Sequence, residues 1–153
     1  MDELLARQLP QSAEAEQAVI GSMLIDPECI PVVIEQLRPD DFYTEENRRI
    51  FETVYSMFNN AMRIDAVTVL DQLKSAGLYD DAGGRAYLMQ LMDVTPTAAG
   101  VQEYAAIVRD KSMLRAIAAA GAEIEKLAFE GGGTAADIAE LAEQKIYNVR
   151  QGR

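Results

Sequence analysis

Hydrophobic residues recur at helical spacing along almost the whole chain, in segments separated by glycine, proline and small polar residues. No segment shows the strict alternation of apolar and polar positions that is typical of a β-strand. The pattern predicts helices over residues 13–25, 27–37, 44–58, 66–76, 84–94, 98–129 and 134–149. The sequence therefore predicts an all-α fold.

Residues at the ends of these segments support the predicted boundaries. Thr44, Asp65 and Thr134 each precede an apolar helical pattern and are suitable N-cap residues. Gly77 is a stop signal for the fourth helix. Gly131–Gly133 separate the last two segments and predict a turn between them.

The last third of the chain differs from the rest because residues 98–129 contain no proline. One face of that segment carries Tyr104, Ile107, Val108, Leu114, Ile117, Gly121, Ile124 and Ala128. After the glycine turn, the inner face of the next helix carries Ile138, Leu141, Ala142, Ile146 and Val149. We therefore expect a globular multi-helix head (1–97) followed by a C-terminal antiparallel helical hairpin (98–150). Met113 and Tyr147 lie off the predicted seam, which suggests packing on the head or on another copy.

The segment DFYTEENRRIF (41–51) combines aromatic rings with two adjacent arginines. Such a mixture can form a stacking surface for single-stranded nucleic acid, or it can be the start of a helix with a buried apolar side. Ile50, Phe51, Val54, Tyr55 and Phe58 follow helical spacing, with Arg48, Arg49 and Glu52 between them toward solvent. We favour the buried helix.

The charge distribution argues against nucleic acid as the partner of the head. The chain has a formal net charge of −11, and residues 1–100 contain 17 acidic and 7 basic residues, a net charge of −10. Phosphate backbones are bound mainly by lysine and arginine. An acidic surface could bind a basic protein partner, although solubility alone would also explain the excess.

The sequence lacks the combinations of residues that are typical of an active site. The chain contains no histidine, and Cys29 is its single cysteine, which we interpret as a small core residue in a reducing compartment. The glycines 131–133 lack the following lysine of a phosphate-binding loop, and the carboxylate pairs look like turn residues. We expect no catalytic, cofactor or metal residues, no membrane span and no export signal, hence a cytosolic binding or assembly module.

Four segments in order resemble the N-terminal domain of the bacterial replicative DNA helicase family DnaB. They are PQSAEAEQAVIGSMLIDP (10–27), DDFYTEENRRIF (40–51), RIDAVTVLDQL (63–73) and AGGRAYLMQLMDVTPTAAGVQEYAAIVRDKSMLR (82–115). The resemblance extends from about Pro10 to Val149. Leu9 replaces a common proline and Asn47 a frequent histidine, and we expect neither difference to affect the architecture.

The resemblance implies a domain without catalytic activity. In that family a helical head and hairpin are followed by a linker, which residues 151–153 would begin, and by an ATPase domain. ATP and Mg²⁺ would bind in that absent part, and the chain would be an excised domain. The N-terminal domains of the family pair through their hairpins into a collar, a trimer of dimers, which also binds the C-terminal domain of primase.

The resemblance also implies two sets of contact residues. The predicted primase-binding residues are Glu14, Tyr87 and Ile124, and the predicted self-association residues are Met113, Leu114, Ile117, Ile124, Leu141 and Tyr147. Leu114 and Leu141 could instead close the seam inside the hairpin. Glu14 could simply be a favourable charge at a helix N-terminus, and Tyr87 could be a core residue with its hydroxyl at the surface.

Two other functions remain open at this point. A free-standing helical nucleic-acid-binding protein would show salt-sensitive affinity for single-stranded DNA. The helicase-binding domain of a primase is also a helical head with a terminal hairpin, although the order of the EAEQ (14–17) and RIDAVT (63–68) motifs favours the helicase side.

Overall fold

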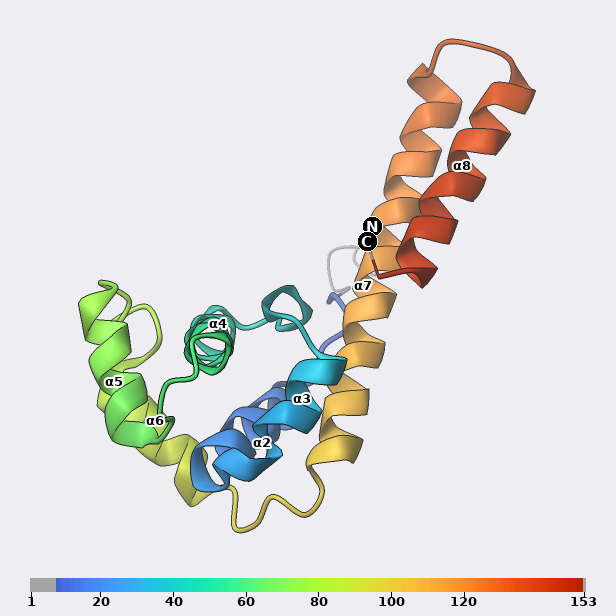
Figure 1. Ribbon diagram of the computed structural model, residues 1–153. Helices are drawn as coiled ribbons and strands as arrows, with labels where there is room; N and C mark the ends of the chain where they lie inside the picture. The colour runs from blue at the N-terminus through green and yellow to red at the C-terminus, as the bar shows by residue number, and fades with distance from the viewer. Residues whose placement is uncertain (1–7, 153) are drawn as a thin grey trace. The chain divides into compact units, whose positions relative to one another are not determined.

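The computed structural model describes residues 8–152, and within that range the chain forms only helices and connecting turns (Figure 1). The predicted all-α fold is confirmed. The helices are α2 (Ala13–Ile25), η1 (Pro27–Cys29), α3 (Ile30–Gln36), η2 (Pro39–Asp41), α4 (Glu45–Asn59), α5 (Ala66–Ser75), α6 (Gly84–Asp93), α7 (Val101–Glu130) and α8 (Ala135–Arg150), where η marks a 3-10 helix.

Most of the predicted caps form. The Asp65 carboxylate accepts from Thr68 N, and the Thr134 hydroxyl accepts from Asp137 N, each within a reciprocal capping box. Gly77 has a φ of 72° and directly follows the C-cap of α5, where the left-handed conformation favours glycine. Thr44 occupies the N-cap position of α4 as predicted, although its side chain makes no capping hydrogen bond.

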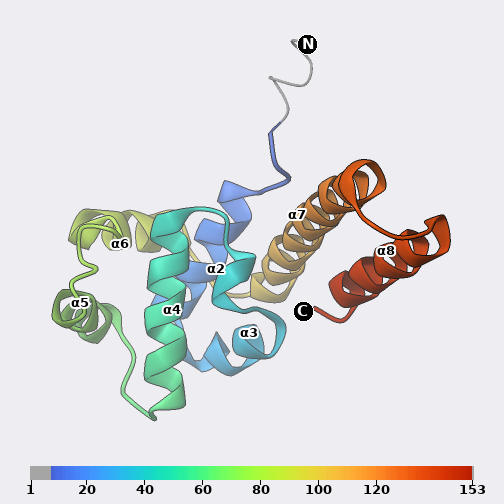
Figure 2. The ribbon, with the colours of Figure 1, turned by 90° about the horizontal axis from the view of Figure 1, so that it is seen from above.

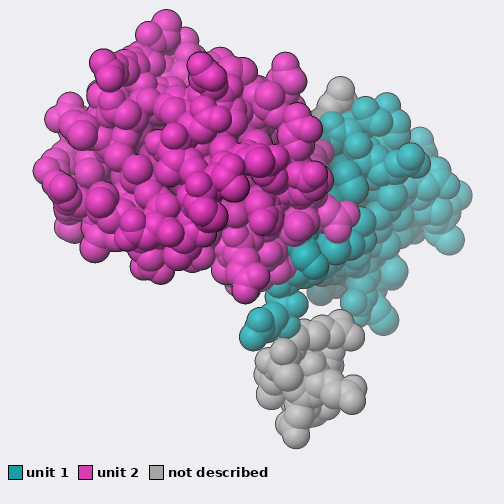
Figure 3. Space-filling view, turned by 90° about the horizontal axis from the view of Figure 1, so that it is seen from below, with its two compact units in different colours: residues 1–10, 111–153 teal, residues 11–110 magenta. Residues whose placement is uncertain are grey.

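The chain divides into two compact units, which Figure 3 shows in different colours. Unit 2 comprises residues 11–110, and unit 1 comprises residues 1–10 and 111–153. Helix α7 contributes residues to both units.

Helix α2 is the centre of unit 2, where it contacts η1, α4 and α6 (Figure 2). It is apolar on several sides, and Val19, Ile20 and Met23 are fully buried. The rings of Phe42 and Phe51 pack on each other with their centroids 4.6 Å apart. These large side chains place the core of unit 2 around one enclosed helix rather than along a seam.

Gly21 allows the end of α6 to approach α2 closely. A Cβ at this position would overlap Thr95 Oγ1 and would lie 2.7 Å from Leu91 O. Thr95 is itself buried, and its hydroxyl donates to Leu91 O at 2.8 Å. The missing side chain of Gly21 is therefore a packing requirement.

The first part of α7 belongs to the core of unit 2. Val101, Ala105 and Val108 are buried in that core, and Arg109 Nη1 lies 3.4 Å from Asp41 Oδ1. Unit 2 thus extends beyond the predicted head (1–97). Of the residues predicted on one face of this segment, Val108 is buried as expected, whereas Tyr104 and Ile107 are 41% and 40% exposed. Ala105, which was not predicted on that face, is buried.

Unit 1 contains the helical hairpin. The rest of α7 is joined through Gly131–Gly133 to α8, and Lys145 Nζ of α8 contacts Glu123 Oε2 of α7 at 2.7 Å. Ala120 is the one buried residue among 111–152, and α8 contains none. The hairpin therefore leaves most of its apolar residues at least partly exposed.

Within residues 8–152, no single helix is long and apolar enough to cross a membrane. The segments Ala13–Ile25 and Pro27–Gln36, which are separated by a sharp bend, are together long and apolar enough, by length and composition only.

Candidate protein-binding surfaces

A chain of hydrogen bonds joins three helices of unit 2. Glu16 of α2 is only 2% exposed, and its carboxylate accepts from Tyr43 N at 2.8 Å, Thr44 N at 3.2 Å and Asn47 Nδ2 at 3.1 Å. The Tyr87 hydroxyl of α6 donates to Asn47 Oδ1. Glu16 therefore holds the chain as it enters α4, where a negative charge is favoured by the helix dipole.

Tyr87 combines a core position with access to solvent. The side chain is half-buried and packs against the core of unit 2. Burial raises the pKa of the Tyr87 hydroxyl, and the nearby carboxylates of Glu46 and Glu16 act in the same direction. The hydroxyl is therefore protonated at neutral pH, which matches its role as a donor to Asn47.

The other predicted primase-binding residues occupy different surroundings. Glu14 is exposed in the first turn of α2, two positions before the buried Glu16. Ile124 is half-buried on α7 in unit 1. The structure therefore places Glu14 and Tyr87 in one unit and Ile124 in the other.

Sequence reasoning missed Glu16 and Asn47. Asn47 in place of a frequent histidine was expected to leave the architecture unchanged, but the sequence did not show that this residue is fully buried and bonds to both Glu16 and Tyr87. A signal was available: Glu16 lies one residue after Ala15, three before Val19 and four before Ile20, all on the buried side of α2. A carboxylate there needs donors from another element.

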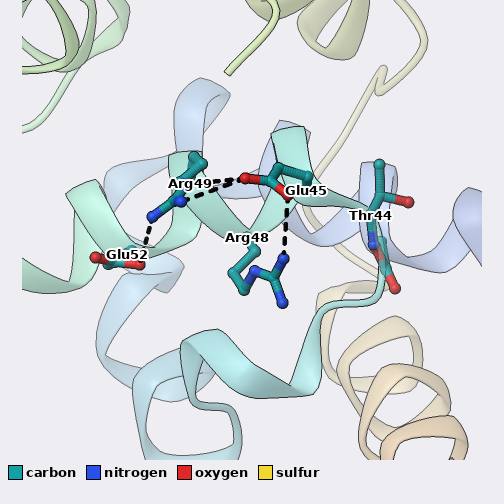
Figure 4. A network of polar contacts seen from close by, with 6 residues as sticks. Thr44, Glu45, Arg48, Arg49 and Glu52 are labelled. Carbon is teal, nitrogen blue, oxygen red and sulfur yellow. Dashed lines mark hydrogen bonds and ion pairs between the residues drawn. The ribbon is translucent and has the colours of Figure 1, made fainter. Parts of the chain in front are cut away.

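The segment that starts α4 confirms the preference for a buried helix. Phe42 and Phe51 are 1% and 0% exposed, while Tyr43 is 41% exposed. On the outer side, Arg48 and Arg49 lie 3.5 Å and 3.3 Å from the carboxylate of Glu45, and Arg49 also lies 3.9 Å from Glu52 (Figure 4). The two arginines are thus paired with acidic neighbours on their own helix.

Some of the apolar residues predicted on the buried side of α4 are buried, and one is exposed. Ile50 and Val54 are buried as expected. Phe58, predicted on the same side, is 37% exposed, and Met57 is buried in its place. The helix therefore turns a slightly different face to the core than the spacing predicts.

Most of the predicted self-association residues are exposed on the hairpin. Four of them are 40% exposed or more: Leu114, Ile117, Leu141 and Tyr147. Met113 and Ile124 are half-buried. A shallow groove of about 430 Å³ is lined by Ile124, Ala142, Glu143, Ile146, Tyr147 and Arg150. The structure thus brings Ile124 and Tyr147 together on one face of the hairpin.

Gly131–Gly133 and Cys29 have the structural roles that the sequence predicts. Gly131–Gly133 connect two helices, as predicted. Cys29 is half-buried against the core, and burial raises the pKa of its thiol to about 11, so the thiol is protonated at neutral pH. No group of three or more histidine, cysteine or acidic side chains suited to a metal ion occurs in residues 8–152.

Comparison with known proteins decides the family. The model of the DnaB-like helicase N-terminal domain matches residues 8–110. The chain is 36% identical over 149 residues to the replicative DNA helicase DnaB of Mycobacterium leprae (strain TN), which covers 96% of the chain. The chain belongs to the DnaB-like helicase N-terminal domain family.

Solved structures of the DnaB family agree with this assignment. The chain superposes with a TM-score of 0.86 on the crystal structure of the N-terminal domain of DnaB helicase from Mycobacterium tuberculosis. That match has 36% identity and covers 92% of this chain and 99% of the other. A DnaB-like replicative helicase, solved in a study of its interactions with primase, has the same fold, with a TM-score of 0.75 at 19% identity over 90% of this chain and 31% of that one.

The chain corresponds to a limited part of its DnaB relatives. It spans 25% of the Mycobacterium leprae protein and 34% of the DnaB of Geobacillus stearothermophilus, to which it is 35% identical over 152 residues. The match therefore concerns the N-terminal domain alone.

Proposed function

We propose that this chain is the collar domain of a replicative DNA helicase, which assembles copies of the helicase and docks primase without catalysing a reaction itself. The hairpin pairs with the hairpin of a second copy, and three such dimers form the collar. ATP and Mg²⁺ bind to the ATPase domain of the full-length helicase, which acts in the cytosol.

The apolar surface of the hairpin carries this proposal. A two-helix hairpin with a single buried residue, Ala120, hides little apolar surface from water on its own. Its exposed side chains include Ile117 at 44%, Leu141 at 48% and Tyr147 at 54%. Several exposed apolar side chains on one hairpin are typical of a protein interface rather than of solvated helices.

Charge and the neighbouring structure support primase as the second partner. The acidic residues of the head disfavour nucleic acid and suit a basic protein surface. Tyr87 is half-buried beside the acidic Glu46, and half-buried tyrosines are frequent anchors of protein interfaces. The similar helicase fold was solved in a study of its interactions with primase.

Sedimentation velocity over a range of concentrations tests self-association. We expect the chain to dimerise and Tyr147→Glu to weaken the dimer by at least about tenfold, because a charge would be buried in the interface. Gln144→Glu is the matched control, since both substitutions place a glutamate four residues after another glutamate, Glu143 or Glu140. A wild-type chain that stays monomeric at high concentration would contradict pairing through the hairpin.

Titration with the C-terminal domain of the primase from the same genome tests docking. We expect saturable binding that Tyr87→Ala or Glu14→Ala weakens. Ile124→Ala tests whether the hairpin contributes to the same contact. Affinity that is unchanged in all three variants, with the helical content intact, would remove these residues from the interface.

A further inference from the structure

We propose that Glu16 and Asn47 are positioning residues for Tyr87, which they hold in the orientation that the partner of the head recognises. This inference rests on the proposed docking function, because it concerns the same surface. It assigns a role to two buried residues that do not themselves reach a partner.

Only one orientation of the Asn47 amide fits Glu16. An ionised carboxylate can only accept hydrogen bonds, so the Asn47 group that faces Glu16 must be its NH2 group. The distance from Asn47 Nδ2 to Glu16 Oε1 is 3.1 Å, and both side chains are buried. Rotating the amide by 180° would place two oxygens against each other, and water is not available there to relieve the contact.

That orientation determines which atom of Asn47 the Tyr87 hydroxyl contacts. With its nitrogen turned to Glu16, Asn47 presents only its oxygen to α6, and the Tyr87 hydroxyl donates to it. The hydroxyl proton is therefore used inside unit 2. A partner would contact the exposed part of the Tyr87 side chain, whose orientation is set by Asn47.

The same hydrogen bonds restrict the motion of the Tyr87 side chain. A tyrosine on a helix can change its χ1 and χ2 angles, and binding is weakened when a side chain must be ordered at the interface. Two hydrogen bonds, from Asn47 to Glu16 and from Tyr87 to Asn47, link α2, α4 and α6. The Tyr87 ring is therefore already ordered before the partner binds. Glu16 also accepts hydrogen bonds from Tyr43 N and Thr44 N, and these bonds fix its carboxylate to the backbone that leads into α4.

A double-mutant cycle tests the inference. We expect Asn47→Ala and Tyr87→Phe each to weaken binding of the primase C-terminal domain by about three- to tenfold, the equivalent of one hydrogen bond. The double variant should bind no more weakly than the weaker single variant, because both changes remove the same contact. Full affinity of Asn47→Ala, or additive losses in the double variant, would overturn the inference.

An isosteric substitution separates positioning from general stability. Asn47→Asp keeps the shape of the side chain and an oxygen acceptor for Tyr87, but it removes the amide donor to Glu16. We expect this variant to weaken binding of the primase C-terminal domain under conditions in which circular dichroism shows it fully folded, because two facing carboxyl groups cannot hold Tyr87 in place as the amide does. Full affinity of Asn47→Asp would count against positioning.

A control variant excludes simple loss of stability. Asp65→Ala removes the N-terminal cap of α5 in the same unit and should lower the melting temperature without changing the affinity. The docking proposal and the positioning role can be contradicted by different results. If Tyr87→Ala binds normally, the docking site itself is wrong and the positioning role falls with it. If Tyr87→Ala abolishes binding while Asn47→Ala does not weaken it, only the positioning role is wrong.

Discussion

Lys145 Nζ lies 2.7 Å from Glu123 Oε2 and joins the two helices of the hairpin across their exposed edge. The Glu123 side chain is 61% exposed, so the ion pair is surrounded by water. Pairs of this kind contribute little to stability and are weakened by salt. The hairpin therefore depends mainly on apolar contacts, although most of its apolar residues remain at least partly exposed.

The Glu123–Lys145 pair predicts a small acid sensitivity of the hairpin. The hydrogen bond and the charge of Lys145 hold the pKa of the Glu123 carboxyl below its ordinary value. The contribution of the pair is therefore present above the ordinary carboxyl pKa and is lost as the pH falls through the lowered value. Amide hydrogen exchange in α8 should show faster opening in Glu123→Gln than in the wild type at neutral pH, and similar opening in acid.

Glu125→Gln is the control for that experiment. Glu125 is exposed on the same helix and makes no hydrogen bond or ion pair within the described residues 8–152. Its substitution should leave the exchange rates in α8 unchanged at every pH. Equal effects of the two substitutions at neutral pH would show that the ion pair does not stabilise the hairpin.

Two glycines on helices should respond in opposite directions to alanine. Gly21→Ala should destabilise unit 2 by about 1–3 kcal/mol, because the new Cβ would overlap Thr95 and press on Leu91 O. Gly121→Ala should stabilise α7 by about 0.5–1 kcal/mol, because nothing lies within 4 Å of the new atom and alanine favours the helix. Urea unfolding followed by circular dichroism measures both. Stabilisation by Gly21→Ala would contradict the close approach of α2 and α6.

Removal of the buried carboxylate should destabilise the head far more than removal of its exposed neighbour. Glu16→Ala leaves Tyr43 N, Thr44 N and Asn47 Nδ2 without their acceptor, and we expect a loss of about 2–4 kcal/mol. Glu14→Ala, on the same helical turn but exposed, should cost about 0.3–1 kcal/mol. Thermal unfolding compares the two variants. Similar losses would show that Glu16 is not needed to hold the start of α4.

The head should not bind single-stranded DNA. Its residues carry most of the net charge of −11, and Arg48 and Arg49 are already paired with Glu45. Fluorescence anisotropy with a labelled oligonucleotide at about 0.15 M salt should show no saturable binding. Binding that weakens steeply as salt is added would instead support a nucleic-acid function for this chain.

The sequence by itself determined the helices and their ends. Asp65 and Thr134 cap helices through contacts with residues three positions away, and Gly77 ends α5 by its own backbone freedom. Such interactions are local, so they can be inferred from short segments. The same locality explains why the glycine turn at 131–133 and the hairpin could be predicted.

Only the tertiary structure decided which polar residues are buried and what they contact. Glu16 and Asn47 are 31 positions apart and Asn47 and Tyr87 are 40 apart, so no local pattern pairs them. The spacing of α7 likewise could not show that Ala105 is buried while Tyr104 is exposed. Helical periodicity indicates that a helix has an apolar face, but the elements packed against that helix decide which residues water can still reach.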